Sequence, residues 1–437
     1  MFLFSGFVAR CRFSVASTLS LYGSLATIAG LTSVLANAQV GALQHTDQPP
    51  TIHVIFPVPG GADVRHHYLE HLTWLNAVGD DRVGSGQHHT NAWTNDYAIG
   101  YRLSGPSDDL ADMLRRLKRV FEPIEVPREF AEQERDILER EYDLRTGGTI
   151  NANAALEMEA FLYQGNQIAG DPIGTPELIR ALNYDDAKGL HAETHRPDRA
   201  RLLVIGNVSE TQLANAVEEA GFPDLDVKRE DIGPPPFALA SIETRIFRYP
   251  DPNAAPRMIL RKVVALPEPL DFDLLEAQAA LARNILDTNL PGGLAGPLRF
   301  DAFVTRSFGI SIVPVDESHI ELIFSAEPDK GIGFAAMQSA FEGALNNSAR
   351  GVPATTYDRV LKRFEGFWPD WSNEEKVARW MADYTLSRVS ILREPKSERQ
   401  MRKIGTQIDA ADIDIILAAL SGPGRTAIAF IGTDPNP

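Results

Sequence analysis

The sequence is poor in cysteine and in positive charge. Its single cysteine among 437 residues is Cys11, near the N-terminus. Disulfides and thiolate metal ligands are therefore excluded from the rest of the chain, and any zinc site must be built from histidine and carboxylate side chains. Lysine and arginine number 42 against 59 acidic residues, which gives a net charge of −17. This balance argues against nucleic acid as a partner, because phosphate contacts need clustered basic side chains.

Charged residues are also missing from residues 13–44, which follow two arginines. This apolar stretch contains an Ala-Asn-Ala cleavage pattern at residues 36–38, so we predict a signal peptide over residues 1–38 that is cleaved before Gln39. The mature protein would then be periplasmic or secreted. Two alternatives stay open. The uncharged run is long enough to be an uncleaved membrane anchor, and the lack of acidic residues before Asp47 is also typical of a mitochondrial transit peptide.

The remaining chain is long enough for two domains. Residues 185–206 and 409–432 both contain a helical stretch and then an apolar strand that ends in Ile-Gly, and the two glycines are 226 residues apart. This similarity predicts an internal duplication, with coincidence as the alternative. Residues 223–244 include three consecutive prolines, which cannot join a helix or a central strand. We therefore predict domains over residues 39–222 and 245–437, with residues 223–244 as the linker.

The clearest chemical signal is an H-x-x-E-H motif formed by His67, Glu70 and His71. It lies in a predicted helix that Asp63 can cap, and residues four apart lie on one face of a helix. Two imidazoles placed in this way can bind one Zn²⁺, and Glu70 could then take a proton from a zinc-bound water. The alternative is a helix that carries two exposed histidines by chance. His66 has no histidine four residues later, so we expect it to be an exposed neighbour.

A catalytic zinc site needs three protein ligands, so one more must come from elsewhere in the chain. The predicted helix that begins near Pro127 is the richest source of carboxylates downstream. Glu134 and Glu141 are seven residues apart and so share a face of this helix. From the pattern alone, a solvated acidic face is the better interpretation of these residues.

Several segments in succession resemble the insulinase, pitrilysin and mitochondrial processing peptidase family of zinc peptidases, in its bacterial half-length form. The matching segments are residues 67–71, 91–94, 134–141, 174–177 and 196–206. The resemblance implies that His67, His71 and Glu141 bind Zn²⁺, that Glu134 supports this site from behind, and that Glu70 is the catalytic base. The protein would then be a zinc metalloendopeptidase acting on peptides or small unfolded polypeptides.

The same resemblance implies an α+β fold. Each of two similar domains would be a largely antiparallel sheet flanked by helices, and together they would form one half of a clamshell. The strand that carries Asn91, Ala92, Trp93 and Thr94 would bind an extended peptide substrate along its edge.

The second half departs from the family pattern. Arg306 occupies the position of a substrate-binding arginine, although an ordinary surface charge is an equal interpretation. Ile312 stands where the family often has a tyrosine, and an aliphatic side chain cannot donate a hydrogen bond to an oxyanion. We therefore expect a dimer, with a heterodimer containing a related Arg/Tyr-bearing subunit favoured over a homodimer. The alternative is a non-catalytic structural or substrate-binding subunit, against which the complete His67, Glu70, His71 and Glu141 set argues.

Overall fold

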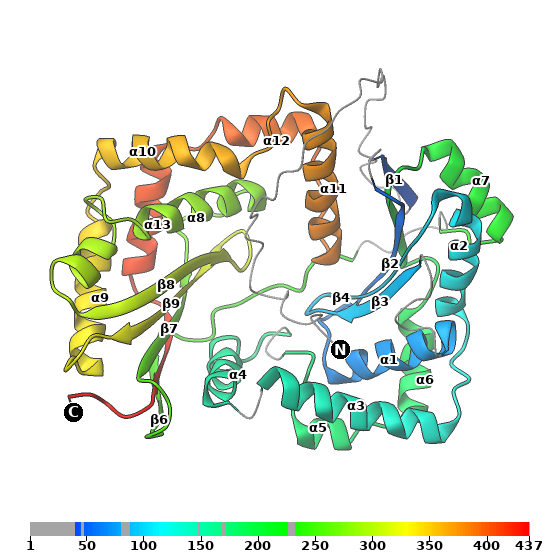
Figure 1. The fold of residues 1–437 in the computed structure, drawn as a ribbon, viewed down its shortest axis with the longest axis horizontal. Coiled ribbons are helices and arrows are strands. Elements are labelled where there is room, and N and C mark those ends of the chain that lie inside the picture. Colours follow the sequence, from blue (N-terminus) through cyan, green and yellow to red (C-terminus); the bar gives the residue numbers. More distant parts are fainter. Residues whose placement is uncertain are drawn as a thin grey trace. The chain divides into compact units, whose positions relative to one another are not determined.

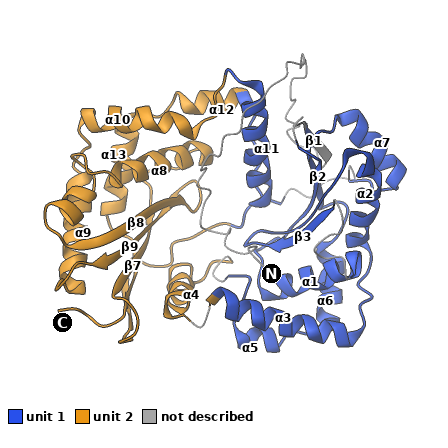
Figure 2. Ribbon diagram, in the orientation of Figure 1, with its two compact units in different colours: residues 1–145, 171–235, 372–398 blue, residues 146–170, 236–371, 399–437 orange. Residues whose placement is uncertain are grey.

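A computed structural model describes residues 40–44, 48–79, 88–146, 149–167, 171–225 and 232–436. The predicted signal peptide, residues 1–38, lies outside the described residues. Within the described part of the chain, no helix has the length and apolar character needed to cross a membrane. The chain divides into two compact units, coloured separately in Figure 2: unit 1 (residues 1–145, 171–235 and 372–398) and unit 2 (residues 146–170, 236–371 and 399–437).

Unit 1 is built on a five-stranded sheet with the strand order β1-β5-β2-β4-β3. The β1–β5 pair is parallel and the other pairs are antiparallel. Its elements, most of them labelled in Figure 1, are β1 (Val40–Gln44), β2 (Thr51–Pro57), α1 (Val64–Val78), β3 (His89–Thr94), β4 (Ala98–Ser104), α2 (Leu110–Lys118), α3 (Arg128–Thr146), α5 (Pro176–Arg180), α6 (Tyr184–Thr194), β5 (Arg201–Gly206), α7 (Glu210–Ala220) and α11 (Glu374–Ser390).

Unit 2 repeats this plan, with the strand order β6-β10-β7-β9-β8 and a single parallel pair, β6–β10. The order and sense of pairing match those of unit 1 strand for strand. The predicted fold class is thereby confirmed: two similar α+β domains, each a largely antiparallel sheet flanked by helices. The elements of unit 2 are α4 (Ile150–Leu162), β6 (Thr244–Tyr249), β7 (Arg257–Ala265), α8 (Phe272–Leu286), β8 (Thr305–Pro314), β9 (His319–Pro328), α9 (Phe334–Ser348), α10 (Ala354–Phe364), α12 (Glu398–Gly405), α13 (Ala410–Ser421) and β10 (Arg425–Ile431).

The two Ile-Gly strand ends are equivalent in space as well as in sequence. Gly206 ends β5 and Gly432 follows β10, and both have positive φ angles, of 139° and 83°. A Cβ on either glycine would lie 2.7 Å from backbone, at Pro50 for Gly206 and at Ala254 for Gly432. Only glycine combines this conformation with such a close approach. The repeated glycine therefore has the same structural cause in each unit.

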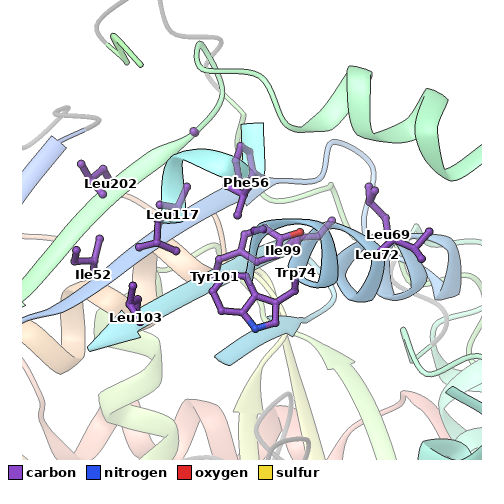
Figure 3. Close-up of a cluster of buried hydrophobic side chains, with 14 of the residues drawn as sticks. Ile52, Phe56, Leu69, Leu72, Trp74, Ile99, Tyr101, Leu103, Leu117 and Leu202 are labelled. Carbon is purple, nitrogen blue, oxygen red and sulfur yellow. The ribbon is translucent and has the colours of Figure 1, made fainter. Parts of the chain in front are cut away.

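The core of unit 1 explains why β2 is apolar along most of its length. Ile52 and Phe56 point from one face of β2 into a cluster with side chains of α1 and α2, part of which is drawn in Figure 3. Ile55 points from the opposite face and packs with Val389 of α11 and Leu392. The strand is thus buried on both faces, as a continuous apolar strand requires.

Each unit also incorporates one segment from the other half of the chain. Helix α4 packs against β6, β7 and β10 of unit 2, and α11 packs against β1 and β2 of unit 1. A buried arginine at the start of the repeated strand holds each segment. Arg425 Nε donates to the Phe161 carbonyl at 2.9 Å, and Arg201 Nη2 lies 3.2 Å from Glu394 Oε1. Because these contacts are distant in sequence, helical periodicity alone did not predict which sheet each helix would cover.

Candidate metal centre

The motif lies in α1, and the N-terminus of this helix is closed by a reciprocal capping box. Asp63 Oδ1 accepts a hydrogen bond from the backbone N–H of Arg65 at 2.9 Å. The ring Nδ1 of His66 in turn accepts from the backbone N–H of Asp63 at 3.2 Å. His66 is therefore buried, and the expectation that it is exposed was wrong, because its ring completes the capping box. This cap fixes where the helix begins and so which face carries the motif.

His67, Glu70 and His71 lie on one face of α1, close to one another. The ring centroids of His67 and His71 are 4.9 Å apart. Glu70 Oε2 is 3.9 Å from His67 Nε2. His67 and Glu70 are buried, whereas His71 is slightly more open. The helical spacing therefore places both imidazoles and one carboxylate together, as the sequence predicted.

Helix α3 brings two further carboxylates to the same place. The Tyr68 hydroxyl donates to the Ala131 carbonyl at 2.9 Å, which fixes α3 against α1. Glu141 Oε2 lies 3.6 Å from His67 Nε2, and Glu141 Oε1 lies 3.6 Å from His71 Nε2. One potential ligand atom from each of these three residues lies within 4.8 Å of the others. This is the one cluster of at least three potential metal ligands among the described residues.

The spacing of these atoms fits a small divalent cation. In a tetrahedral site with ligands about 2.0–2.2 Å from zinc, neighbouring ligand atoms lie roughly 3.4 Å apart. The two 3.6 Å separations between Glu141 and the imidazoles are close to this value and too long for hydrogen bonds. Glu134 Oε2 lies 2.9 Å from Nδ1 of His71, which leaves the Nε2 of that ring directed at Glu141. The donor set therefore suits zinc, with Glu134 orienting one imidazole.

The electrostatics of the site favour the same occupant. Burial lowers the pKa of His67 well below its usual range, and the nearby His71 and Arg145 lower it further, so its ring is neutral and can donate a lone pair. Burial alone would also lower the pKa of His71. That pKa is nevertheless raised, because its hydrogen bond with Glu134 and the nearby carboxylates outweigh the effect of burial. The carboxylates thus favour positive charge in the site, and a bound cation would supply that charge.

Glu70 can exchange a proton near neutral pH. Burial raises its pKa to about 7; the charges of His71 and Arg145 oppose this rise and that of Glu141 adds to it. The Thr94 hydroxyl donates to Glu70 Oε2 at 3.3 Å and holds the carboxylate in place. Sequence reasoning missed Arg145, whose Nη2 lies 3.1 Å from Glu141 Oε2. The i, i+4 spacing of this Glu–Arg pair in α3 was the available signal.

The predicted substrate-binding residues Asn91, Ala92, Trp93 and Thr94 lie in β3. Within the described residues this strand pairs with β4 alone, so it forms an edge of the sheet. Trp93 lies across Gly100 of β4, where an added Cβ would be 2.2 Å from the indole ring. The hydrogen bond from Thr94 to Glu70 places the end of this edge beside the motif.

Arg306 and Ile312, the two positions considered in the second half of the sequence, belong to unit 2. Arg306 lies at a bulge in β8 with its side chain exposed, and its Nη2 is 2.6 Å from Glu327 Oε2. Ile312 points into the core of unit 2. Of the residues between them, Ser307 and Gly309 are exposed, Phe308 and Ser311 are half-buried and Ile310 is buried. A tyrosine facing outward is therefore missing from the described strand that follows Arg306.

Comparisons with known proteins identify the fold. No family model and no curated protein matches the sequence. Among solved structures, a protease from Helicobacter pylori matches with 16% identity and a TM-score of 0.68, covering 88% of this chain and 94% of that one. The periplasmic protease PqqL from Escherichia coli matches with 12% identity and a TM-score of 0.68, covering 89% of this chain and 46% of that one. A peptidase M16 inactive domain from Pseudomonas fluorescens matches with 12% identity and a TM-score of 0.65, covering 90% and 95%. The chain thus has the fold of M16-like peptidases.

Proposed function

We propose that this protein is a zinc-dependent endopeptidase that hydrolyses peptides or small unfolded polypeptides. His67, His71 and Glu141 would bind the metal, and Glu70 would act as general base. The observation that carries this proposal is the convergence of α1 and α3, with both imidazole Nε2 atoms 3.6 Å from the carboxylate oxygens of Glu141 and with Glu70 beside them. The shared fold with M16-like peptidases supports the same reaction class without identifying it.

When bound, zinc would supply Lewis-acid polarisation of the scissile carbonyl and lower the pKa of water. The chain's own residues would move the protons. Glu70, whose pKa burial raises to about 7, can accept a proton from water on Oε2 and return it to the leaving amine. Thr94 holds that carboxylate, and Glu134 lies against Nδ1 of His71, so that Nε2 of this ring would be free to bind the metal.

The exposed edge of β3 offers a place for the substrate. An extended peptide can add to a sheet edge through backbone hydrogen bonds, which recognise the main chain rather than particular side chains. The Thr94–Glu70 hydrogen bond means that a peptide held along residues 91–94 would end close to the proposed base. We therefore propose substrate binding by Asn91, Ala92, Trp93 and Thr94.

The decisive experiment measures zinc content and cleavage of a quenched fluorescent peptide library by the wild-type chain and by Glu70→Gln. We expect about one zinc per chain in both proteins, and a loss of activity of at least ~100-fold in the variant, because a general base contributes about 10²–10⁴-fold. Glu132→Gln, an exposed substitution on α3, serves as the control and should cleave normally. Undiminished cleavage by Glu70→Gln would remove this residue from the mechanism.

A separate observation favours a second subunit over activity of this chain alone. The more exposed positions that follow Arg306 on β8 carry no tyrosine, and one structure with the same fold is described as an inactive domain. We therefore propose that full activity needs a related subunit that supplies an Arg/Tyr pair, in a heterodimer rather than a homodimer. Arg306 would then contribute to substrate binding. This chain matches about half of PqqL, which supports pairing with a second, related half. PqqL is a periplasmic protease, which supports a periplasmic or secreted location for this chain.

Co-purification from the native source distinguishes these arrangements. A zinc-loaded chain that is inactive alone and gains activity with a co-purified related subunit would establish the heterodimer. Cleavage by the isolated chain at the same rate as the native preparation would contradict the need for a partner.

A further inference from the structure

Unit 2 contains a cavity of about 350 Å³ with an unusual charge for this protein. Its lining comes from the segment after α8 (residues 287–300), from Phe308 of β8 and from α10. Three arginines line it, Arg299, Arg359 and Arg363, against one acidic residue, Asp287. The chain as a whole has a net charge of −17, so a concentration of positive charge in one hollow requires a specific explanation.

The three arginines have no acidic partner within the described part of the chain. Arg299 contacts the ring of Phe300, with its guanidinium carbon 5.6 Å from the centroid. The side chains of Arg359 and Arg363 take part in no ion pair or hydrogen bond with another described residue. Asp287 does not neutralise them, because its carboxylate is directed at Arg283, with Nη2–Oδ2 at 3.6 Å. The cavity therefore presents guanidinium donors that remain available to a ligand.

The arrangement of the arginines matches the geometry of an anionic ligand. Arg359 and Arg363 are four residues apart on α10, so they lie on one face of that helix and repel each other. Arg299 approaches the same cavity from the segment before β8. Guanidinium groups that converge from two elements match the geometry of carboxylate or phosphate oxygens, to which arginine donates paired hydrogen bonds.

The apolar part of the lining favours the carboxylates of a peptide over an inorganic phosphate. Phe300 and Phe308 also face the cavity, and Phe308 is fixed by stacking on the core residue Phe324 at 5.9 Å between centroids. Phe300 is itself 52% exposed. An inorganic anion would leave these apolar rings without contacts, whereas an acidic peptide with apolar side chains would satisfy both parts of the lining.

We propose that this cavity, the Arg299/Arg359/Arg363 pocket, is a binding site for an acidic peptide segment. The carboxylates of the peptide would pair with the arginines, and its apolar side chains would pack on Phe300 and Phe308. The site does not depend on peptidase activity, since its residues are separate from the metal-binding cluster. If the proposed activity holds, the pocket would favour substrates that contain an acidic segment.

The test uses the full chain with Glu70→Gln, so that no peptide is consumed. Fluorescence anisotropy would measure binding of a labelled peptide of alternating glutamate and phenylalanine. A matched peptide with glutamine in place of glutamate reports any binding that does not need carboxylates, including binding at the β3 edge. We expect the acidic peptide to bind at least about tenfold more tightly, and this preference to fall as salt is raised.

The double variant Arg359→Gln/Arg363→Gln should remove this preference, and Arg299→Gln should weaken it by about tenfold. Lys362→Gln is the control, because Lys362 is an exposed cation on the same helix that does not line the pocket. These four side chains are exposed, and an unchanged thermal melt would show that each variant folds. Equal binding of the two peptides, an unchanged preference in the double variant, or displacement of the peptide by equimolar inorganic phosphate would each overturn the proposal.

Discussion

Helices α1 and α8 occupy the same place in the two units, yet their inward faces differ in chemistry. Both have 15 residues and begin after a capping aspartate, Asp63 or Asp271. The fourth, seventh and eighth residues after the cap are His67, Glu70 and His71 in unit 1, but Leu275, Gln278 and Ala279 in unit 2. A proline before α3 and a proline before α10 align these two helices in the same way. The seventh and fourteenth residues after the proline are Glu134 and Glu141 in unit 1, but Val360 and Phe367 in unit 2.

The comparison shows that the fold does not need the polar cluster. In unit 2, Leu275, Ala279 and Val360 belong to one hydrophobic core, and α8 packs directly on α10. Unit 1 places carboxylates and imidazoles in the equivalent space, where burial without full compensation costs stability. Since the apolar solution is available to this architecture, the polar set in unit 1 is best explained by chemistry rather than by packing.

A second pair of equivalent positions differs in how each unit handles buried polarity. The repeated strands align the two sheets, because Arg201 of β5 pairs with Ile55 of β2 and Arg425 of β10 pairs with Val263 of β7. Two residues before these partners stand His53 in β2 and Arg261 in β7, so His53 corresponds to Arg261. His53 is a buried imidazole, whereas the Nε of Arg261 lies 2.6 Å from Glu321 Oε1. One unit thus buries a neutral base and the other a charged pair, which leads to different responses to mutation and to pH.

The largest expected effect is the difference between a substitution in α1 and the equivalent substitution in α8. His67→Ala should lose the metal and reduce cleavage to background, because two protein ligands cannot retain zinc as three do. The equivalent change in unit 2, Leu275→Ala, should leave the zinc content unchanged and lower the free energy of unfolding by about 2–5 kcal/mol, since it opens a cavity in the core. Metal analysis after dialysis and urea denaturation measure the two outcomes. Full zinc occupancy in His67→Ala would show that the cluster is not the metal site.

The next effect concerns the charged pair of unit 2. Arg261→Leu should lower the stability of this unit by about 3–5 kcal/mol, because Glu321 is fully buried and would keep an uncompensated charge. Arg257→Leu on the same strand is the control. Arg257 is partly exposed in its ion pair with Glu327, so its loss should cost less than about 1 kcal/mol. Equal destabilisation by the two changes, measured by urea denaturation, would contradict this view of the pair.

Acid should weaken unit 1 before unit 2. Burial, and to a lesser extent the charge of Arg102, lowers the pKa of His53 from 6.5 to about 3. The unfolded chain binds a proton below pH 6.5 that the folded chain does not bind until about pH 3. The stability that neutral His53 provides is therefore complete above pH 6.5 and lost as the pH falls, by about 2 kcal/mol at pH 5.

Hydrogen exchange measured at pH 7.5 and pH 5 would test this difference. Protection in β2 and β4 should fall more than protection in β7 and β9, and His53→Leu should reduce the pH dependence of β2. An identical loss in both units, or an unchanged pH profile in His53→Leu, would show that this residue does not set the acid response.

The smallest effect tests the support behind the metal ligands. Glu134→Gln should weaken zinc binding by about 10–100-fold, because the amide keeps the contact with His71 but loses the negative charge that polarises the ring. The exposed Glu132→Gln should leave the affinity unchanged. Competition with a zinc chelator measures both variants, and equal affinities would assign Glu134 a packing role alone.

The sequence alone determined those features that depend on local geometry. The i, i+4 spacing of His67 and His71 placed both rings on one helical face, and the seven-residue spacing of Glu134 and Glu141 did the same for α3. The Ile-Gly strand ends revealed the duplication, because a backbone position that only glycine can occupy leaves a mark in the sequence. These signals are local, since helical and strand periodicity act over a few residues.

Only the tertiary structure decided which distant residues meet. It brought Glu141 to the imidazoles and Glu134 behind His71, joined Thr94 to Glu70, and placed α4 on the sheet of unit 2 and α11 on that of unit 1. It also showed that Ile312 faces a core, and it gathered the three arginines around one cavity. These outcomes depend on which apolar faces bury each other across the chain, and residue spacing along a single element carries no record of that choice.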